Sequence, residues 1–408
     1  MTAPRRRVAM LSSVHPPFDT RIFQKEARSL AAAGYDVTLV VPHERDEVVD
    51  GVRIVALPPA GSRLRRMLAA PSRVLRAALA LRADVYHFHD PELIPVGLAL
   101  KLLGKRVIYD IHEDVPKSIL GKTYLPPGLV RPLAAATGVV EQSSARAFDL
   151  LVLARDDIED SFRDHRHTLL IRNYPSRATF PDVVRQPRGD GAFLVAYTGG
   201  LTAGRGAIEM VDALGRVSER YRPRMVIFGK FWPEELEARV RALPGFARVD
   251  YRGWAPYESL PGQLAAADAG IVCFLPEPNH VNAGPTKLFE YMACGLPVVA
   301  SDFPMWRTVV EGNGCGLCVN PADPGAIAGA LEYLADHPEQ RAIMGRNGRK
   351  AVIEKYNWEV EAERLIRAYE DCWPCLKRSR VAHQASRDRT ETGGGACRRM
   401  ILAAHEQA

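Results

Sequence analysis

The sequence predicts an α/β protein with two doubly wound parallel-sheet domains that face each other across a cleft. Short apolar strand candidates alternate with helical patterns along two long stretches of the chain, which is typical of parallel sheets covered by helices. A segment rich in proline and charge, 173–191, separates the two stretches. The length of 408 residues exceeds the roughly 100–200 residues of one domain. We therefore expect two domains joined by one linker, with ligands bound beyond the carboxyl ends of the strands.

The first stretch opens with a strand over 7–12 and a helix over 20–33, which Gly34 ends. Further candidates are strands over 36–41, 52–57, 85–89, 106–110 and 149–153, and helices over 95–103 and 133–148. This half forms the predicted N-terminal domain, 1–172, and 173–191 is the linker.

The second stretch repeats the pattern and forms the predicted C-terminal domain, 192–375. Its candidates are strands over 193–197, 224–228, 248–251, 269–274 and 297–300, and helices over 207–217, 233–242, 260–266, 286–293, 324–336 and 358–372. The last segment, 376–408, is basic and rich in Arg, Ser and Gly, so we expect it to be disordered.

Composition excludes several classes of protein. Apolar residues make up 47 % and charged residues 25 %, as in soluble globular proteins. No uncharged apolar stretch reaches the roughly 18 residues of a transmembrane helix, and the N-terminus lacks a signal peptide, so we expect a cytoplasmic protein.

The chain has 7 cysteines, an odd number, which argues against a disulfide framework. Cys315-x-x-Cys318 and Cys372-x-x-Cys375 have the spacing of half zinc sites, but the long, largely helical stretch between them favours reduced thiols.

The net charge of +6 is concentrated in the first half, where residues 1–180 carry 26 Lys and Arg against 20 Asp and Glu. Six arginines lie in the acid-free stretch 61–82, interleaved with leucines. Two interpretations stay open: a basic amphipathic helix that contacts an anionic membrane, or a surface helix with its apolar face in the core. Nucleic acid is not an expected partner, because the basic residues lack interleaved aromatics.

A glycine-rich loop, 199–206, leaves a predicted strand and enters a predicted helix. Gly199 and Gly200 permit close backbone approach, the helix start offers unpaired N–H groups, and Arg205 adds a cation suited to phosphate oxygens. The loop is either a diphosphate cradle or an ordinary glycine-rich turn.

A second motif, 282–301, predicts a loop from Asn282, a short helix and a buried strand. The N–H groups of Thr286 and Lys287 would lie at the helix start, where anions bind well. Glu290 follows one turn later on the same face and is suited to accept hydrogen bonds from sugar hydroxyls. A solvated helix glutamate is the alternative. Trp254 and Tyr257 would either flank a nucleotide base or pack in the core.

Histidines and acids cluster after two predicted strands of the first domain. His87 and His89 lie at the end of one predicted strand, 85–89, and His112 and Glu113 follow the next, so these side chains are expected near the cleft. A metal site on His87, His89 and His112 is a hypothesis that strand alternation does not favour.

The sequence resembles the retaining glycosyltransferases of family 4, which have the GT-B fold. The resemblance covers about 7–372, and the segments that carry it follow the family's order: Pro17–Ile22 before Lys25-Glu26-Ala27, Tyr109–Glu113, 199–206, 285–295 and Tyr356-Asn357-Trp358. It implies two Rossmann-like domains, with the last helix crossing back to the first. It also implies transfer of a sugar from a nucleotide diphosphate sugar with retention at the anomeric carbon, without metal or cofactor.

The resemblance also implies residue roles. Glu290 matches the second glutamate of an E-x7-E motif, which holds the ribose, whereas Asn282 stands where the first glutamate, at the donor sugar, is expected. Arg205 matches the second residue of a basic pair, Gly200 replaces the first, and Lys287 is a candidate substitute. His112 matches the active-site histidine. The expected catalytic residues are therefore His112, Arg205 and Glu290, and the expected donor-binding residues are Gly199, Gly200, Arg205, Asn282, Thr286, Lys287 and Glu290. The expected acceptor-side residues are His15, Asp19, Arg21, His89 and Glu113.

The function that follows is a glycosyltransferase of cell-surface glycan assembly, with a nucleotide sugar donor, a lipid-linked or saccharide acceptor and peripheral contact with an anionic membrane. A nucleotide-sugar 2-epimerase of the same fold and a catalytically silent nucleotide-sugar-binding protein remain alternatives. An oxidoreductase is disfavoured, because the first strand is not followed by G-x-G-x-x-G.

Overall fold

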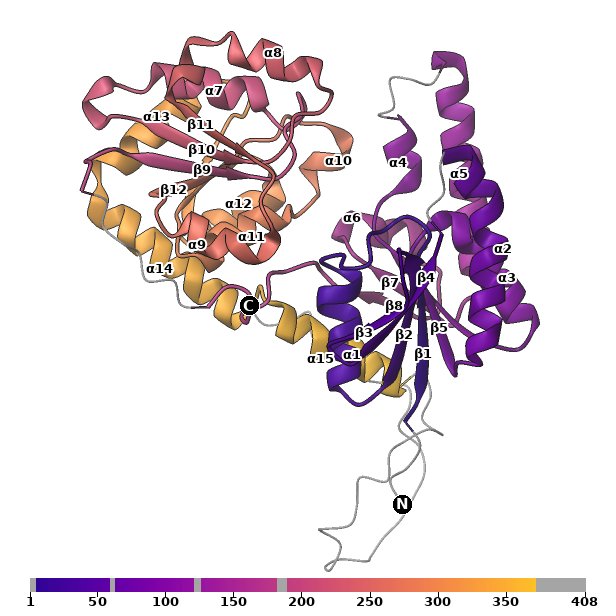
Figure 1. Cartoon of the computed structure of the whole chain (residues 1–408). Coiled ribbons are helices and arrows are strands. Elements are labelled where there is room, and N and C mark those ends of the chain that lie inside the picture. Colours follow the sequence, from indigo (N-terminus) through magenta and orange to yellow (C-terminus); the bar gives the residue numbers. More distant parts are fainter. Residues whose placement is uncertain (1–4, 59–62, 121–125, 182–188, 372–408) are drawn as a thin grey trace, which may run out of the picture.

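The computed structural model describes residues 5–58, 63–120, 126–181 and 189–371, and these form two sheets, each covered by helices on both faces (Figure 1). The predicted pair of doubly wound parallel-sheet domains is confirmed. The predicted tail, 376–408, lies outside the described residues, as do Cys372 and Cys375.

The first sheet has strand order β3-β4-β2-β1-β5-β6-β7-β8, and its pairs are parallel except for β3 with β4. Its strands are β1 (Arg7–Leu11), β2 (Asp36–Pro42), β3 (Glu47–Val49), β4 (Val52–Leu57), β5 (Val85–Phe88), β6 (Arg106–Ile111), β7 (Leu150–Leu153) and β8 (Thr168–Leu170). Its helical segments are η1 (Ile22–Ala27), α1 (Arg28–Ala32), α2 (Arg63–Leu81), η2 (Pro91–Leu93), α3 (Ile94–Leu102), α4 (Val115–Leu120), α5 (Pro127–Ala145), α6 (Asp156–Glu159) and η3 (Asp160–Phe162).

The second sheet has strand order β11-β10-β9-β12-β13-β14, and its pairs are all parallel in the described part of the chain. Its strands are β9 (Leu194–Thr198), β10 (Arg224–Phe228), β11 (Val249–Gly253), β12 (Ala269–Val272), β13 (Val298–Ser301) and β14 (Gly316–Val319). The helices are α7 (Ala207–Arg216), η4 (Glu219–Tyr221), α8 (Glu235–Arg241), η5 (Pro244–Arg248), η6 (Tyr257–Ser259), α9 (Leu260–Leu264), α10 (Pro278–Val281), α11 (Thr286–Ala293), α12 (Pro304–Val310), α13 (Pro324–Asp336), α14 (Pro338–Glu354) and α15 (Trp358–Asp371).

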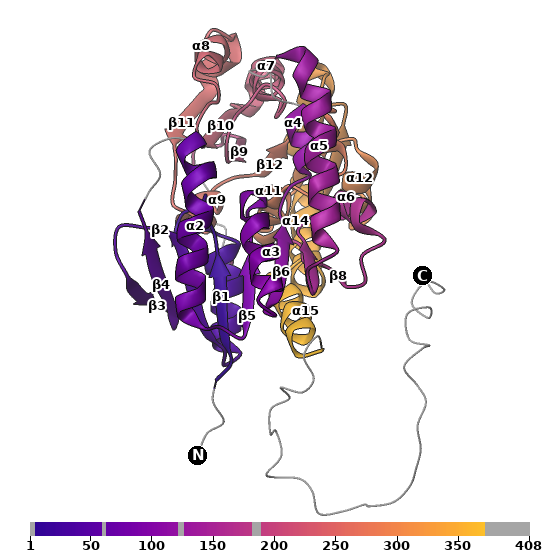
Figure 2. The same ribbon diagram turned by 90° about the vertical axis from the view of Figure 1, so that its right-hand side faces the viewer.

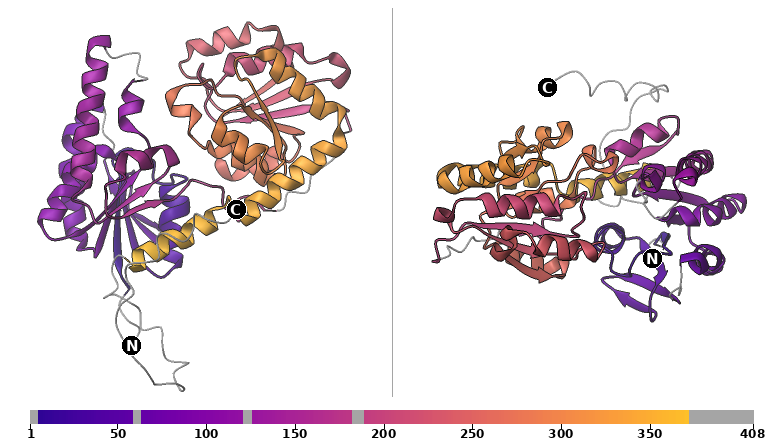
Figure 3. Two further views of the ribbon diagram at one scale, coloured as in Figure 1. Left: turned by 180° about the vertical axis from the view of Figure 1, so that it is seen from behind. Right: turned by 90° about the horizontal axis from the view of Figure 1, so that it is seen from above.

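The last helix crosses back to the first domain, as the resemblance implies (Figure 3). Trp358, Leu365 and Tyr369 of α15 are buried in the core on the η1 and α1 face of the first sheet. The Trp358 indole donates to Ser29 Oγ at 2.9 Å. The first domain therefore takes part of its core from the far end of the described chain.

The segment between the two sheets is held against the second domain over part of its length. Tyr174 and Phe180 are buried in that domain's core, and the Trp358 N–H donates to Pro175 O at 3.0 Å. These apolar side chains fix the path of the chain before the gap at 182–188.

Some elements differ from the sequence prediction. The first helical segment starts at Ile22 instead of residue 20, and before it the Asp19 carboxylate accepts the N–H groups of Arg21 and Ile22 in a turn. The strands β3, β8 and β14 and the helices α4, α6, α10, α12 and α14 were not predicted.

The arginine-rich segment 61–82 contains α2. Val74 and Ala78 of this helix are buried in the core on the second face of the first sheet, while Arg73 and Arg76 are exposed. The described part of the helix therefore fits the interpretation in which its apolar face lies in the core. Of the helices in the described residues, none has the length and apolar character needed to cross a membrane.

Candidate functional site

A cavity of about 940 Å³ lies between the two domains, at the carboxyl ends of strands from both sheets. Ten of the predicted site residues line it. They are His15, Asp19, Arg21, His112 and Glu113 from the first domain and Gly199, Arg205, Thr286, Lys287 and Glu290 from the second. Both predicted motifs of the second domain therefore face the predicted acceptor side across one cavity.

Three predicted site residues do not line this cavity. Asn282 is exposed after α10, and Gly200 turns its carbonyl toward Tyr197 Oη (2.8 Å) and Arg205 Nη1 (3.2 Å). His89 is buried beneath the cavity, where its Nδ1 lies 3.1 Å from Asp110 Oδ2. His89 therefore contacts Asp110 beneath the cavity and does not face the cavity itself.

The glycine-rich loop is built for tight packing. Gly199 has φ +93°, and a Cβ there would lie 3.2 Å from Lys287 Nζ. Gly206 has φ +71°, and a Cβ there would lie 2.0 Å from Cys273 O. The glycines thus bring the β9–α7 loop against α11 and against the end of β12, where side chains would not fit.

Arg205 and Lys287 bring two basic side chains to the second domain's half of the cavity. Thr202 Oγ1 accepts the Arg205 N–H at 3.1 Å, and the guanidinium donates to Gly200 O at 3.2 Å, with no carboxylate paired to it among the described residues. Lys287 Nζ is buried without a hydrogen-bond partner, 3.9 Å from the centre of the Tyr197 ring. Burial, together with the Arg205 charge, lowers the pKa of Lys287 well below its usual range. A buried amine beside a second cation is costly unless an anion joins them.

Glu290 lies in the same half, one helical turn after Thr286. It is buried, and this burial raises its pKa, while the charges of Lys25 and Lys287 act in the opposite direction. Burial and the nearby Glu290 carboxylate raise the pKa of Tyr257, whose Oη has no hydrogen-bond partner. Tyr257 lines the cavity, whereas Trp254 is exposed outside it.

His112 is anchored from below by Asp110. The His112 Nε2 lies 2.8 Å from Asp110 Oδ2, and the Arg21 guanidinium donates to both oxygens of this carboxylate at 3.1 and 2.9 Å. Burial would raise the pKa of Asp110, but Arg21 and the imidazoles outweigh burial and hold it well below its usual range. Because an ionised Asp110 only accepts, His112 donates through Nε2, and its Nδ1 remains the free ring nitrogen.

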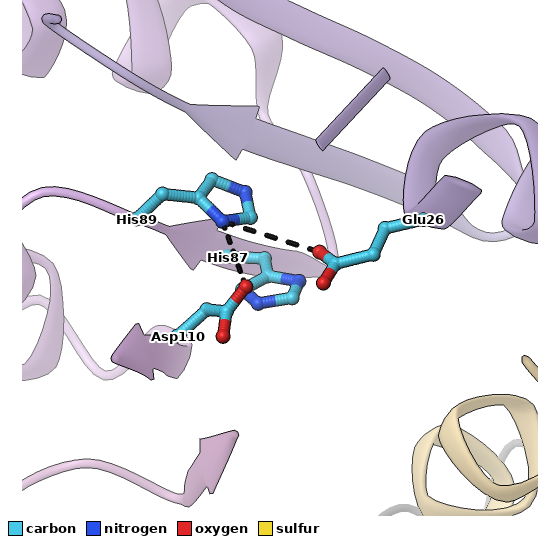
Figure 4. A group of neighbouring side chains, drawn as sticks. All are labelled: Glu26, His87, His89 and Asp110. Atoms are coloured by element: carbon cyan, nitrogen blue, oxygen red, sulfur yellow. Dashed lines mark hydrogen bonds and ion pairs between the residues drawn. The ribbon is translucent and has the colours of Figure 1, made fainter. Parts of the chain in front are cut away.

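Four buried side chains, Glu26, His87, His89 and Asp110, gather beneath the cavity with ligand-type atoms within 4.8 Å of one another (Figure 4). His87 Nδ1 is hydrogen-bonded to Tyr369 Oη of α15 at 2.8 Å. Arg21 lies 3.0 Å from Glu26 and 2.9 Å from Asp110, so its guanidinium already forms ion pairs with both carboxylates of the cluster. The cluster does not contain His112, so it differs from the three-histidine metal hypothesis.

Comparison with known proteins identifies the class of this site. Residues 182–351 match the family model described as glycosyl transferases group 1, and residues 20–169 match the one described as a glycosyl transferase 4-like domain. A phosphatidyl-myo-inositol mannosyltransferase of Mycobacterium leprae is 28 % identical over 352 residues, which are 85 % of this chain and 88 % of that protein. The chain is a family 4 glycosyltransferase.

Other relatives of this glycosyltransferase agree. A glycogen synthase of Mycobacterium tuberculosis is 24 % identical over 398 residues, covering 89 % of this chain and 94 % of that protein. Sucrose-phosphate synthase from Thermosynechococcus elongatus superimposes with TM-score 0.75 at 20 % identity, over 91 % of this chain and all of that one. Anabaena HepE, solved in complex with UDP-glucose, gives TM-score 0.68 at 15 % identity, over 90 % and 99 % of the two chains. The structural neighbours share the GT-B fold.

Sequence reasoning missed two residues of the glycosyltransferase's cavity, Lys25 and Asn173. Lys25 Nζ donates to Asn173 Oδ1 at 2.6 Å, and burial lowers the pKa of Lys25 to about 7. The sequence offered a signal for Lys25, since this residue follows Arg21 by four positions and so lies on the same helical face.

Arg155 is a third residue that the sequence did not single out. Its Nη2 donates to Asn279 O at 3.1 Å, and both residues line the cavity. This hydrogen bond joins the first domain to the second at one edge of the site.

Proposed function

We propose that this glycosyltransferase moves a sugar from a nucleoside diphosphate sugar to a glycolipid or polysaccharide acceptor, with retention at the anomeric carbon and without a metal ion. One observation carries the proposal. Arg205 and the unpartnered Lys287 line the interdomain cavity beside the start of α11, with no carboxylate paired to Arg205 among the described residues.

Departure of a nucleoside diphosphate develops negative charge on its terminal phosphate. Arg205 and the N–H groups that begin α11 supply fixed positive charge in a partly buried site, where such preorganised donors are most effective, and Lys287 adds its charge when an anion lies beside it. An anion between Arg205 and Lys287 would also relieve the cost of burying the Lys287 amine. This arrangement supports metal-free transfer, since the chain itself supplies positive charge at the proposed diphosphate site.

Glu290 is suited to the ribose of the donor. Its carboxylate lies within the cavity, next to the proposed diphosphate site, and accepts hydrogen bonds when ionised. On the other side of the cavity, the free Nδ1 of His112 is available to a hydroxyl of the transferred sugar or of the acceptor.

The comparisons support the substrate classes. The M. leprae relative is named for mannosyl transfer to a phosphatidylinositol, and HepE was solved with UDP-glucose, so a nucleotide sugar donor and a lipid-linked acceptor are the first pair to test. Asn282 stands where the resemblance implies a glutamate at the donor sugar, so the donors to test differ in sugar as well as in base.

The test incubates the full chain with a panel of UDP- and GDP-sugars and a lipid extract, and detects products by mass spectrometry, with and without EDTA. We expect one donor to yield a glycosylated lipid or saccharide, equally with EDTA, and NMR of the product to show the donor's anomeric configuration. Consumption of donor without acceptor would indicate an epimerase instead. Calorimetric binding of nucleotide with no turnover would indicate a silent binding protein.

A further inference from the structure

Two neighbouring strands of the first sheet bring a histidine and a buried carboxylate together. Strands β1 and β5 are parallel partners (Figure 2), with Leu11 in register with Phe88, so the chain leaves both strands at the same edge of the sheet. His15 follows β1, and Asp90 follows β5. The His15 Nδ1 lies 3.0 Å from Asp90 Oδ1. The strand pairing thus forms a carboxylate–imidazole pair from two residues that are far apart in the sequence.

Asp90 is buried and surrounded by hydrogen-bond donors. Its Oδ2 accepts the Ser13 N–H at 2.6 Å and the hydroxyls of Ser12 and Ser13 at 2.9 and 3.2 Å. Burial would raise the pKa of Asp90, but His15 and these donors outweigh burial and hold it below its usual range. Among the described residues, no lysine or arginine is ion-paired with Asp90. A positive charge on His15 would therefore meet a carboxylate that no other cation neutralises.

The ionised Asp90 fixes which ring nitrogen of His15 carries the proton. Because a carboxylate only accepts, Nδ1 donates, and Nε2 of the neutral ring keeps a lone pair. Ser12 Oγ, 3.2 Å from Nδ1, gives its own proton to Asp90 and so can only accept from Nδ1. In the described part of the chain no residue is hydrogen-bonded to Nε2. His15 lines the interdomain cavity, as Arg205 does, so this lone pair is available to a substrate.

His112 is less suited to take up a proton. Its ring centre lies 5.2 Å from that of His15, so both imidazoles stand on the same wall of the cavity. Its carboxylate, Asp110, already accepts two hydrogen bonds from Arg21 and lies 3.1 Å from His89 Nδ1. A carboxylate that a buried arginine neutralises stabilises an imidazolium less than one that faces the imidazole alone. Of the two histidines, His15 is therefore the better proton acceptor.

We propose, on the basis of the function proposed above, that His15, oriented by Asp90, takes the proton of the acceptor hydroxyl during sugar transfer. The acceptor oxygen forms its bond to the anomeric carbon. The bond from that carbon to the diphosphate oxygen breaks, and its electron pair leaves with the diphosphate. The proton moves from the acceptor oxygen to His15 Nε2 and passes to water after the product departs. His15 is then a catalytic residue and Asp90 a positioning residue. The alternative destination of the proton is the departing diphosphate itself.

The first experiment compares transfer and nucleotide binding in His15→Gln. Glutamine can hydrogen-bond a hydroxyl but cannot take up its proton, so kcat should fall by about 10²-fold or more. The affinity for UDP or GDP, measured by calorimetry, should stay unchanged. The matched control is His43→Gln, because His43 Nε2 also pairs with a carboxylate, 2.6 Å from Glu47 Oε1, but does not line the cavity. This variant should transfer like the unaltered chain. Circular dichroism checks that each variant is folded.

The second experiment measures the pH profile of kcat in Asp90→Asn. His15 takes up a proton only when it is neutral, so kcat falls as the pH drops through the pKa of His15. Burial would lower this pKa, but Asp90 outweighs burial and raises it. Asp90→Asn should therefore lower kcat and move the acid limb to lower pH. The other titratable groups that face His15 are unaltered in this variant: Asp19, His89, Asp110 and His112.

A folded His15→Gln that transfers at the unaltered rate would assign the proton to the diphosphate and overturn the proposal. An Asp90→Asn profile with an unmoved acid limb, or an equal loss of kcat in His43→Gln, would also overturn it. If Asp90→Asn does not fold, His15→Gln decides alone. An unaltered chain that transfers no sugar would overturn the proposed function together with this step, whereas a loss confined to the proton transfer leaves nucleotide binding intact.

Discussion

Lys25 and Glu290 come from different domains, and each acts on the charge of the other across the cavity. Glu290 raises the pKa of Lys25 against the effect of burial, and Lys25 lowers the pKa of Glu290. The first domain therefore helps to set the protonation of a residue that we assign to the donor.

This relationship predicts the pH dependence of nucleotide binding. In Lys25→Met, Glu290 loses an opposing charge, its pKa rises, and its carboxylate protonates at higher pH. We expect the acid limb of nucleoside diphosphate affinity, measured by calorimetry, to move to higher pH, with the largest effect below about pH 7, where Lys25 is charged. Arg28→Met, at an exposed position one turn later, is the control and should leave the profile in place. An unchanged limb in Lys25→Met would separate Lys25 from Glu290.

Arg205 is predicted to act on the leaving diphosphate. Arg205→Ala should lower kcat by about 10²–10³ with little change in thermal unfolding, because one preorganised donor to the developing charge is lost. Glu290→Ala should also cut transfer severely. Arg216→Ala, an exposed arginine paired with Asp212 on α7, should leave kcat unchanged. Near-normal transfer in Arg205→Ala would remove Arg205 from the site.

Asp110 is predicted to stabilise the fold and to position His112. Asp110→Asn removes one of the two carboxylates that pair with the buried Arg21 and leaves only Glu26, 3.0 Å away, so the free energy of unfolding should fall by about 3 kcal/mol in urea titrations. Because the folded pKa of Asp110 lies below its ordinary value of 3.8, its contribution is complete above that value and is lost as the pH falls through the folded pKa. Asp212→Asn breaks an exposed pair and should cost about 0–1 kcal/mol. Equal losses in the two variants would contradict the assignment.

His15 is predicted to titrate above its ordinary value of 6.5. Burial alone would lower its pKa, but Asp90, 3.0 Å away, outweighs burial and raises it. The pair's contribution to stability is therefore complete below the unfolded pKa of His15 and is lost as the pH rises through the folded one. NMR titration should show the raised pKa, and Asp90→Asn should lower it. A His15 pKa unaffected by Asp90→Asn would show that the pair is not formed.

Gly206 is predicted to tolerate no side chain, because its φ is positive and a Cβ would collide with the Cys273 carbonyl oxygen. Gly206→Ala places a Cβ against Cys273 O at a positive φ, so unfolding should be easier by at least about 1–2 kcal/mol. Gly329→Ala is the matched control, since Gly329 lies in α13 with open space around it and should gain up to about 1 kcal/mol. Denaturant midpoints compare the two. A Gly206→Ala protein as stable as the unaltered chain would show that the loop relaxes.

The sequence predicted elements whose signal is local. Helix α11 was predicted with its observed bounds, because Pro285 precedes its start and Gly295 follows its end. Helix α14 was missed because it packs through glycines: a Cβ at Gly345 would lie 2.1 Å from Gly295 O, so this contact leaves no apolar stripe to detect.

Lys25 was missed at the site because its effect on the pKa of Glu290 depends on a residue far away in the sequence. His89 was expected at the cavity because strand ends usually face it, but its ring is packed beneath Asp110 and Glu26.

The crossing of α15 has a consequence for biosynthesis. A ribosome makes the eight strands of the first sheet long before Trp358, Leu365 and Tyr369, which complete the core on one face of that sheet. This face of the nascent first domain therefore stays uncovered until the second domain has been translated and α15 can pack on it.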